Sequence, residues 1–206
     1  MIPFILAYDE RDTDLGHFFE MCAFDVQNNL MSDEHRLEVE ITSQKLTEVY
    51  MDMKLSAYTE NHFVFLAYSH GNENNLLSPE SYLNVNSNLK PFKNTLFYTF
   101  SCSTGVNLGN KLIENGCIAF VGYKIEACIV TRNEDVFVEC ANFGLKIFIA
   151  GENVSSSLKQ MKDRHTEWID KTYNKYPLVA SVLRKNRDGL VLHGDKTLKI
   201  SQLKTK

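Results

Sequence analysis

Two residues that can do covalent chemistry each follow an apolar segment of the chain. His70 and Gly71 follow the segment HFVFLAYS, and Cys102 follows TLFYTFS thirty-two positions after His70. A buried strand needs neither an imidazole nor a thiol at its end, so packing alone does not explain these residue types. Imidazole can take the proton of a nearby thiol, and the resulting thiolate is a nucleophile. The pattern therefore predicts a Cys-His site.

The residues beside this pair suit the same chemistry. Gly71 has no Cβ, which lets its amide approach a ligand closely, and the N–H groups of Gly71 and Cys102 together could stabilise an oxyanion. Imidazole titrates near neutral pH, so His70 could also return a proton to a leaving amine. A helix expected over residues 104–115 would place its positive end directly after Cys102 and favour the thiolate.

The elements that must position these residues alternate along the chain between predicted strands and predicted helices. The apolar runs are continuous, which is typical of strands covered on both faces, and the expected fold class is α/β, a mostly parallel central sheet between layers of helices. Ligands gather at the carboxyl ends of such strands, where His70 and Cys102 lie. We expect strands at 2–8, 38–43, 62–68, 95–101 and 117–123, helices at 15–30, 43–55, 104–115, 134–150, 153–176 and 177–187, and a late hairpin at 190–201.

Length and composition predict one globular domain. The chain has 206 residues, of which 44% are hydrophobic and 11% aromatic, and these values exclude a disordered protein. We expect a single domain over 1–206, with its core at about 1–150 and with C-terminal helices and a hairpin at 151–206. The segment 71–94 is polar and is expected to be a loop that contains a short hairpin.

The charge of the chain is unevenly distributed. The net charge is −4, but residues 153–206 contain 12 Lys and Arg against 5 Asp and Glu. We interpret the basic C-terminal part as solvated helix faces that complement the acidic remainder, so direct binding of nucleic acid is not indicated. The expected partner is a protein or peptide substrate, with a regulatory protein as a further candidate.

Cysteine usage and hydropathy bear on cofactors and location. The five cysteines are odd in number and contain no C-x-x-C motif, which argues against a disulfide framework and against a structural zinc site. No cofactor and no metal is therefore expected. The chain shows no apolar run long enough to span a membrane, and its first residues do not resemble a signal peptide, so a cytoplasmic location is expected.

The segments FVFLAYSHG and LFYTFSCSTG, followed by FVGY at 120–123, resemble the caspase-like cysteine peptidases. This superfamily includes caspases, metacaspases, gingipain and clostripain relatives, separases and bacterial CHAT domains. The resemblance covers about residues 1–150. It implies a caspase-like α/β/α sandwich and a Cys-His dyad endopeptidase that needs no metal, with His70 as the dyad histidine, Gly71 as its oxyanion partner and Cys102 as the nucleophile. It also implies regulated cleavage of one protein, including in bacterial immunity.

Specificity stays open, because the chain departs from the family pattern. The separation of the pair is shorter than the roughly 50 residues of caspases, and Phe100 stands where metacaspases carry an acid. Arg11 could bind an acidic P1 side chain, as an arginine does in caspases, whereas Glu126 could favour a basic one. Phe100, Ser101 and Tyr123 are further candidates for substrate contact.

Two other functions remain as alternatives. The same fold could serve as a catalytically inactive interaction scaffold, or the chain could be a flavodoxin-like domain that binds phosphate at the helix expected over 104–115. His165 is expected to pack on a helix face near Trp168, and the His-Gly pair at 193–194 is expected to lie in a hairpin turn. No G-x-S-x-G, Walker or G-x-G-x-x-G motif is present.

Overall fold

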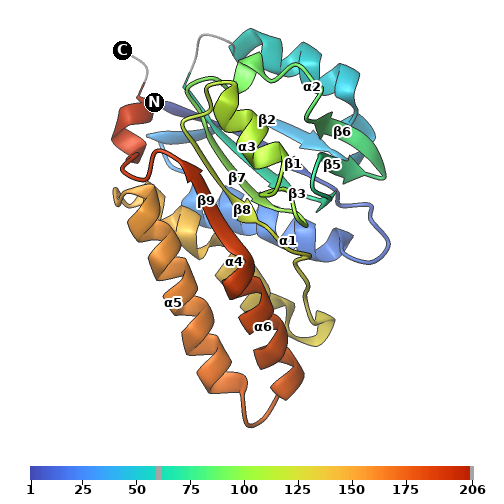
Figure 1. The fold of residues 1–206 in the computed structure, drawn as a ribbon, viewed down its shortest axis with the longest axis vertical. Coiled ribbons are helices and arrows are strands. Elements are labelled where there is room, and N and C mark those ends of the chain that lie inside the picture. Colours follow the sequence, from blue (N-terminus) through green and yellow to red (C-terminus); the bar gives the residue numbers. More distant parts are fainter. Residues whose placement is uncertain (59–61, 205–206) are drawn as a thin grey trace.

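A six-stranded sheet forms the centre of the computed structural model, which describes residues 1–58 and 62–204 (Figure 1). The strands lie in the order β2–β1–β3–β7–β8–β9. Neighbours from β2 to β8 are parallel, and β9 is antiparallel to β8. The prediction of a mostly parallel α/β sheet is therefore confirmed. The strands are β1 (Ile2–Tyr8), β2 (His35–Thr42), β3 (Val64–Tyr68), β7 (Leu96–Phe100), β8 (Ala119–Tyr123) and β9 (Leu190–Gly194).

Helices cover both faces of the sheet, which is why its central strands are continuous apolar runs. Two separate hydrophobic clusters lie on these faces. The first cluster packs under α1 (Gly16–Asp25), α4 (Glu134–Ile149), α5 (Val154–Thr172) and α6 (Pro177–Gly189). The second packs under α2 (Glu48–Leu55), α3 (Leu108–Glu114) and the hairpin of β5 (Asn75–Ser78) and β6 (Glu80–Asn84).

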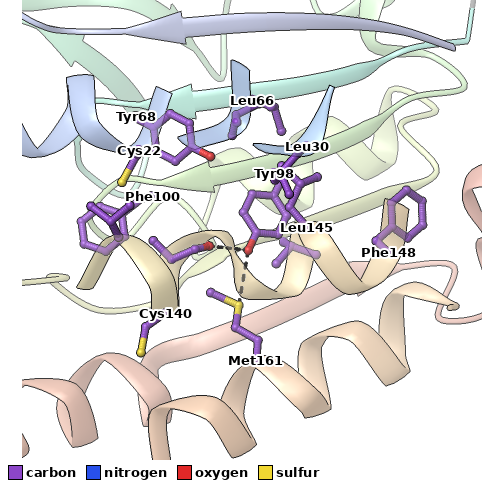
Figure 2. Packing of buried hydrophobic residues seen from close by; sticks show 14 of the residues in the cluster. Cys22, Leu30, Leu66, Tyr68, Tyr98, Phe100, Cys140, Leu145, Phe148 and Met161 are labelled. Carbon is purple, nitrogen blue, oxygen red and sulfur yellow. Dashed lines mark hydrogen bonds between the residues drawn. The ribbon is translucent and has the colours of Figure 1, made fainter. Parts of the chain in front are cut away.

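The first cluster contains polar side chains that are satisfied within the core (Figure 2). The Tyr98 hydroxyl donates to the Ala141 carbonyl oxygen at 2.5 Å and lies 3.4 Å from the Met161 sulfur. The Tyr68 hydroxyl donates to Asn142 Oδ1 at 2.6 Å. A buried hydroxyl without a partner costs free energy, so these contacts allow aromatic residues with polar ends to fill the core.

The register of β3 and β7 brings the two candidate residues to one edge. Tyr68 and Phe100, the last residues of these strands, are register partners, and both side chains belong to the first cluster. Successive strand residues point to opposite faces, so residues two positions further on lie on the same face again. His70 and Cys102 therefore leave the sheet at neighbouring strand ends on the side of α1 and α4.

The helix after Cys102 begins later than the sequence predicts. α3 starts at Leu108, and residues 102–107 form turns. The Ser103 and Gly105 amides donate to the carbonyls of Ile125 and Tyr123 at 2.8 Å each, so they tie this segment to the end of β8 instead of opening a helix. The expected helix dipole at Cys102 is therefore wrong, because this field fades within about one turn of the helix end.

Two smaller expectations also differ. The second helix is capped by Thr47, whose hydroxyl accepts the Tyr50 amide, whereas Ser43 donates its hydroxyl to Asp9 Oδ1 at 2.6 Å. The late hairpin does not form. Its first half is β9, which extends the main sheet, and Lys199 in its second half makes only an isolated bridge to Asn153. The C-terminal part thus completes the common core.

Among the described residues, no helix has both the length and the apolar character required to cross a membrane.

Candidate active site

His70 lies in β4 (His70–Gly71), a two-residue strand that turns away from the main sheet to pair with β5. Its Nε2 lies 3.0 Å from Oδ2 of Asp12, in the loop after β1. Its ring meets the Phe19 ring edge-on, with centroids 5.7 Å apart. The side chain remains 39% exposed. An oriented and accessible imidazole is what a general base requires.

Asp12 is itself held in place. Its Oδ1 accepts the amides of Leu15 at 2.7 Å and Asp14 at 3.0 Å. Burial acts to raise the pKa of Asp12, but these two amides and the His70 ring outweigh it, so the pKa lies below its ordinary value. An ionised carboxylate only accepts hydrogen bonds, so Nε2 of His70 carries the hydrogen of this contact, which leaves Nδ1 as the acceptor atom of the neutral ring. This is the tautomer that can take a proton.

Cys102 lies two residues after the end of β7 and is half-buried. Its thiol donates to the Ala127 carbonyl oxygen at 3.4 Å. Burial raises the pKa of the Cys102 thiol. Within the described part of the chain, no hydrogen bond joins this thiol to the His70 ring. The thiol is therefore turned toward residue 127, and the imidazole is turned toward Asp12.

The backbones that carry the two groups are nonetheless in contact. The Ser69 amide donates to the Phe100 carbonyl oxygen at 3.4 Å. Gly71 lies so close to the second segment that an added Cβ would be 3.0 Å from Ser101 Cβ and 2.9 Å from Thr104 Cγ2. Cys102 lies between these two residues in the chain, so Gly71 is needed for the close approach of the two segments.

The sequence predicts that two backbone amides, those of Gly71 and Cys102, bind an oxyanion. The Asn72 amide donates to the Asn75 carbonyl oxygen at 2.9 Å, and Gly71 is the next residue in the ladder, opposite Leu76. Hydrogen-bonded and non-bonded pairs alternate in an antiparallel ladder, so the Gly71 N–H points away from β5. No hydrogen bond from the Cys102 amide occurs in the described parts of the chain. Both donors that the sequence predicted are compatible with this role.

Ser103, next to the candidate nucleophile, has an unusual backbone conformation. Its φ is +55°, one of two positive values among the described residues other than glycine. Such a conformation costs about 1 kcal/mol or more for a residue with a Cβ. It persists because the Ser103 amide is bonded to Ile125 and its carbonyl accepts the Val106 amide at 2.9 Å. Strain of this kind is concentrated at functional sites.

Three of the candidate substrate-contact residues are buried in this structure. Phe100 packs against the rings of Phe18 and Tyr123, with centroids 4.8 and 5.1 Å away. Ser101 faces the opposite side of the sheet, where it accepts the Thr99 hydroxyl at 2.9 Å. The Tyr123 hydroxyl is buried without a hydrogen-bond partner among the described residues. None of the three presents a surface to a substrate unless neighbouring segments move.

The two charged specificity candidates lie in different loops and are each paired. Arg11 Nε lies 3.7 Å from Glu10 Oε1, and Arg11 lines a pocket of about 380 Å³ together with Asp9 and Asp12. This pocket adjoins the His70 partner. Glu126 lies 3.3 Å from the Lys185 ammonium. The geometry therefore does not choose between acidic and basic P1 side chains.

Sequence reasoning missed the partners of the pair. Asp12 was visible only as one of several acids in the loop DERDTD, and nothing in that text distinguishes it from its neighbours. Ala127 acts through its carbonyl, which carries no sequence signal. Two other histidines carried a prediction: His165 packs on a helix as predicted, whereas His193 lies in a strand and not in the predicted hairpin turn. His165 is buried, with Nδ1 2.8 Å from the Met161 carbonyl oxygen, and burial lowers its pKa to about 4. His193 lies within β9, with Nε2 2.7 Å from the Gly105 carbonyl oxygen.

No group of three or more His, Cys, Asp or Glu side chains is placed to hold a metal ion among the described residues. Comparison of the chain with protein-family models and with curated protein sequences finds no match. The geometry of the site is therefore the basis on which its chemistry is inferred.

Proposed function

We propose that the chain is a cysteine endopeptidase of caspase-like architecture that cleaves a protein substrate in a regulated pathway. One observation carries this proposal. A carboxylate-oriented imidazole and a thiol leave neighbouring strand ends on the same face of the sheet, and their backbones touch at Gly71. The mostly parallel sheet between two helical layers also supports it. Five free cysteines suit a reducing compartment such as the cytoplasm.

In the proposed reaction, His70 Nδ1 takes the proton of Cys102, and the thiolate attacks the scissile carbonyl carbon. Asp12 holds the ring in the required tautomer and stabilises the imidazolium. The amides of Gly71 and Cys102 bind the oxyanion. His70 then protonates the leaving amine, and water, activated by the same imidazole, hydrolyses the acyl-enzyme. Rotation of the Cys102 side chain away from the Ala127 carbonyl is the first step.

A cleavage-site profile of a whole proteome tests the proposal. Wild type, Cys102→Ala and His70→Ala are incubated with a lysate, and new N-termini are identified by mass spectrometry. We expect a set of cleavages that disappears in both variants, with Cys117→Ala as a control that retains them. Cleavages that persist in Cys102→Ala, or no new N-termini with any variant, would remove the support for the proposal.

An inactive interaction scaffold is the second candidate, and the contact between the Cys102 thiol and Ala127 favours it. A thiol that is protonated, half-buried and bonded to a carbonyl is not activated. The two functions differ in what His70 does. In a peptidase, His70→Ala slows alkylation of Cys102 once the thiol is released from the Ala127 carbonyl, because the base that would take its proton is lost. In a scaffold, the substitution leaves the rate unchanged.

A further inference from the structure

Residues 124–130, between β8 and α4, lie against the candidate nucleophile, and we call this segment the covering loop. Its Ala127 is buried and accepts the Cys102 thiol at 3.4 Å. Its Ile125 carbonyl accepts the amide of Ser103 at 2.8 Å. The covering loop thus holds both the candidate nucleophile and the strained residue that follows it.

Asn186 of α6 fixes the covering loop from behind. The residue is 1% exposed. Nδ2 donates to the Cys128 carbonyl oxygen at 2.6 Å, and Oδ1 accepts the Cys128 amide at 3.0 Å. A side-chain amide that pairs with both polar groups of one residue replaces a strand neighbour and restricts that backbone. Because the pairing is largely buried, its loss leaves both backbone groups of Cys128 in need of new partners.

The last residue of α6 contacts the start of the loop. The Gly189 carbonyl accepts the Lys124 amide at 2.9 Å. An added Cβ on Gly189 would lie 2.2 Å from Ile125 Cγ1, so the absence of a side chain allows the loop to pack directly on the helix. The helix therefore controls the path of the chain as it leaves β8.

A third contact reaches the middle of the loop from the same helix. The Lys185 ammonium lies 3.3 Å from Glu126 Oε2 and 3.2 Å from Cys128 Sγ. These residues flank Ala127 on both sides. The position of the carbonyl that accepts the Cys102 thiol is thus set by α6, whose contacts come from a part of the chain almost sixty residues away.

We propose that Asn186 is a positioning residue that locks the covering loop over Cys102, and that the structure shows the resting state of the site. Release of the loop from α6 frees the thiol to turn toward His70. This regulatory role rests on the proposed function, whereas the lock itself is a property of the chain that can be measured without any substrate.

Alkylation of Cys102 by iodoacetamide at pH 7.5 tests the lock. The rate is followed by mass spectrometry of the peptide that contains Cys102, with buried Cys117 as an internal report of global opening. We expect Asn186→Ala to raise the rate at Cys102 about tenfold, which is the effect of losing one to two buried hydrogen bonds, while the rate at Cys117 stays unchanged. Hydrogen exchange of the Lys124 and Cys128 amides should accelerate in parallel.

Asn142→Ala is the matched control, because Asn142 is another buried asparagine, with side-chain hydrogen bonds to Tyr68, Cys22 and Asp25 and none to the covering loop. It should change alkylation of Cys102 less than twofold. Lys185→Ala is a milder variant at an exposed residue and should raise the rate about two- to threefold. If Asn186→Ala does not fold, the alkylation rate of Lys185→Ala tests the lock in its place.

Two results would overturn the lock. Equal acceleration in Asn186→Ala and Asn142→Ala would show that general destabilisation is responsible, and an unchanged rate in Asn186→Ala and Lys185→Ala would show that α6 does not hold the thiol. Failure of the proposed function is distinct. In that case Asn186→Ala still exposes Cys102, but no cleavage that depends on Cys102 is found in the proteome of treated lysate.

Discussion

The loops that carry His70 and Cys102 leave neighbouring strands at one edge of the sheet, yet their surroundings differ. The His70 side, residues 9–16 and 69–72, contains an oriented, partly exposed imidazole whose carboxylate partner is fixed by two amides. The Cys102 side, residues 101–105 and 124–130, contains a half-buried thiol bonded to a carbonyl. The candidate base is thus oriented by a carboxylate, whereas the candidate nucleophile is hydrogen-bonded away from it.

This difference shows where control of such a site can be placed. The His70 imidazole is oriented by contacts with the loop after β1 and with Phe19 of α1, which lie close to one another in the chain. Holding the nucleophile requires the covering loop and α6, which are distant in sequence and can be moved independently. A partner or modification that acts on α6 would change the thiol without disturbing the imidazole.

The largest expected effect concerns the His70 side. Asp12→Asn should lower kcat/KM for Cys102-dependent cleavage about 10- to 100-fold, because the amide can donate to Nε2 and stabilise the wrong tautomer of His70. The pair is partly exposed, so the loss should be smaller than the roughly 10⁴-fold of a fully buried triad carboxylate. Steady-state kinetics on a peptide taken from the cleavage profile measure it.

Asp14→Asn provides the control for this prediction, because Asp14 contributes only its backbone amide to Asp12. It should retain activity within about twofold, since it removes a charge from the same loop without touching His70. Equal losses in the two variants would mean that loop charge, and not orientation of the imidazole, supports the reaction.

The second prediction concerns the pH dependence of the Cys102 side. Thiolate is the reactive form, and burial raises the pKa of Cys102. Alkylation of wild-type Cys102 should therefore increase with pH through a midpoint above the roughly 8.5 of a free thiol. At neutral pH the rate should lie well below that of a model thiol. A midpoint below 8, measured by mass spectrometry over pH 6–10, would contradict the closed resting state.

Two tyrosine substitutions test whether a buried hydroxyl is hydrogen-bonded, one next to the covering loop and one in the core of the first cluster. Tyr123→Phe, on the strand before the covering loop, removes a buried hydroxyl that has no partner among the described residues, and should raise the free energy of unfolding by about 1 kcal/mol. Tyr98→Phe removes a hydroxyl bonded to Ala141 and should lower it by about 1 kcal/mol. Urea denaturation distinguishes the two signs. Equal signs would show that the Tyr123 hydroxyl is satisfied in solution.

The smallest effect concerns the strain beside Cys102. Ser103→Gly should stabilise the protein by about 0.5–1 kcal/mol, because glycine adopts a positive φ without a Cβ clash. Asn94→Gly, at φ +64°, should change stability by only a few tenths of a kcal/mol, since asparagine tolerates this conformation. If Ser103→Gly destabilises as measured by urea denaturation, the Ser103 conformation is not strained.

The sequence by itself determined the parallel strands of the sheet and the edge at which the candidate residues lie. Continuous apolar runs predict strands covered on both faces, and the residues that follow such runs must lie at the carboxyl edge. These signals are local, because they depend on periodicity over a few residues. His70, Gly71 and Cys102 could therefore be selected from the sequence alone, and the fold brings them to one edge of the sheet.

Only the tertiary structure decided how this edge is completed. The choice of Asp12 among several acids, the start of α3 at Leu108 and the pairing of Asn186 with Cys128 depend on contacts between segments that meet after the sheet has assembled. Hydrogen-bonding groups in loops pair with whichever partner the packed elements bring within reach. No periodic pattern in the sequence identifies that partner.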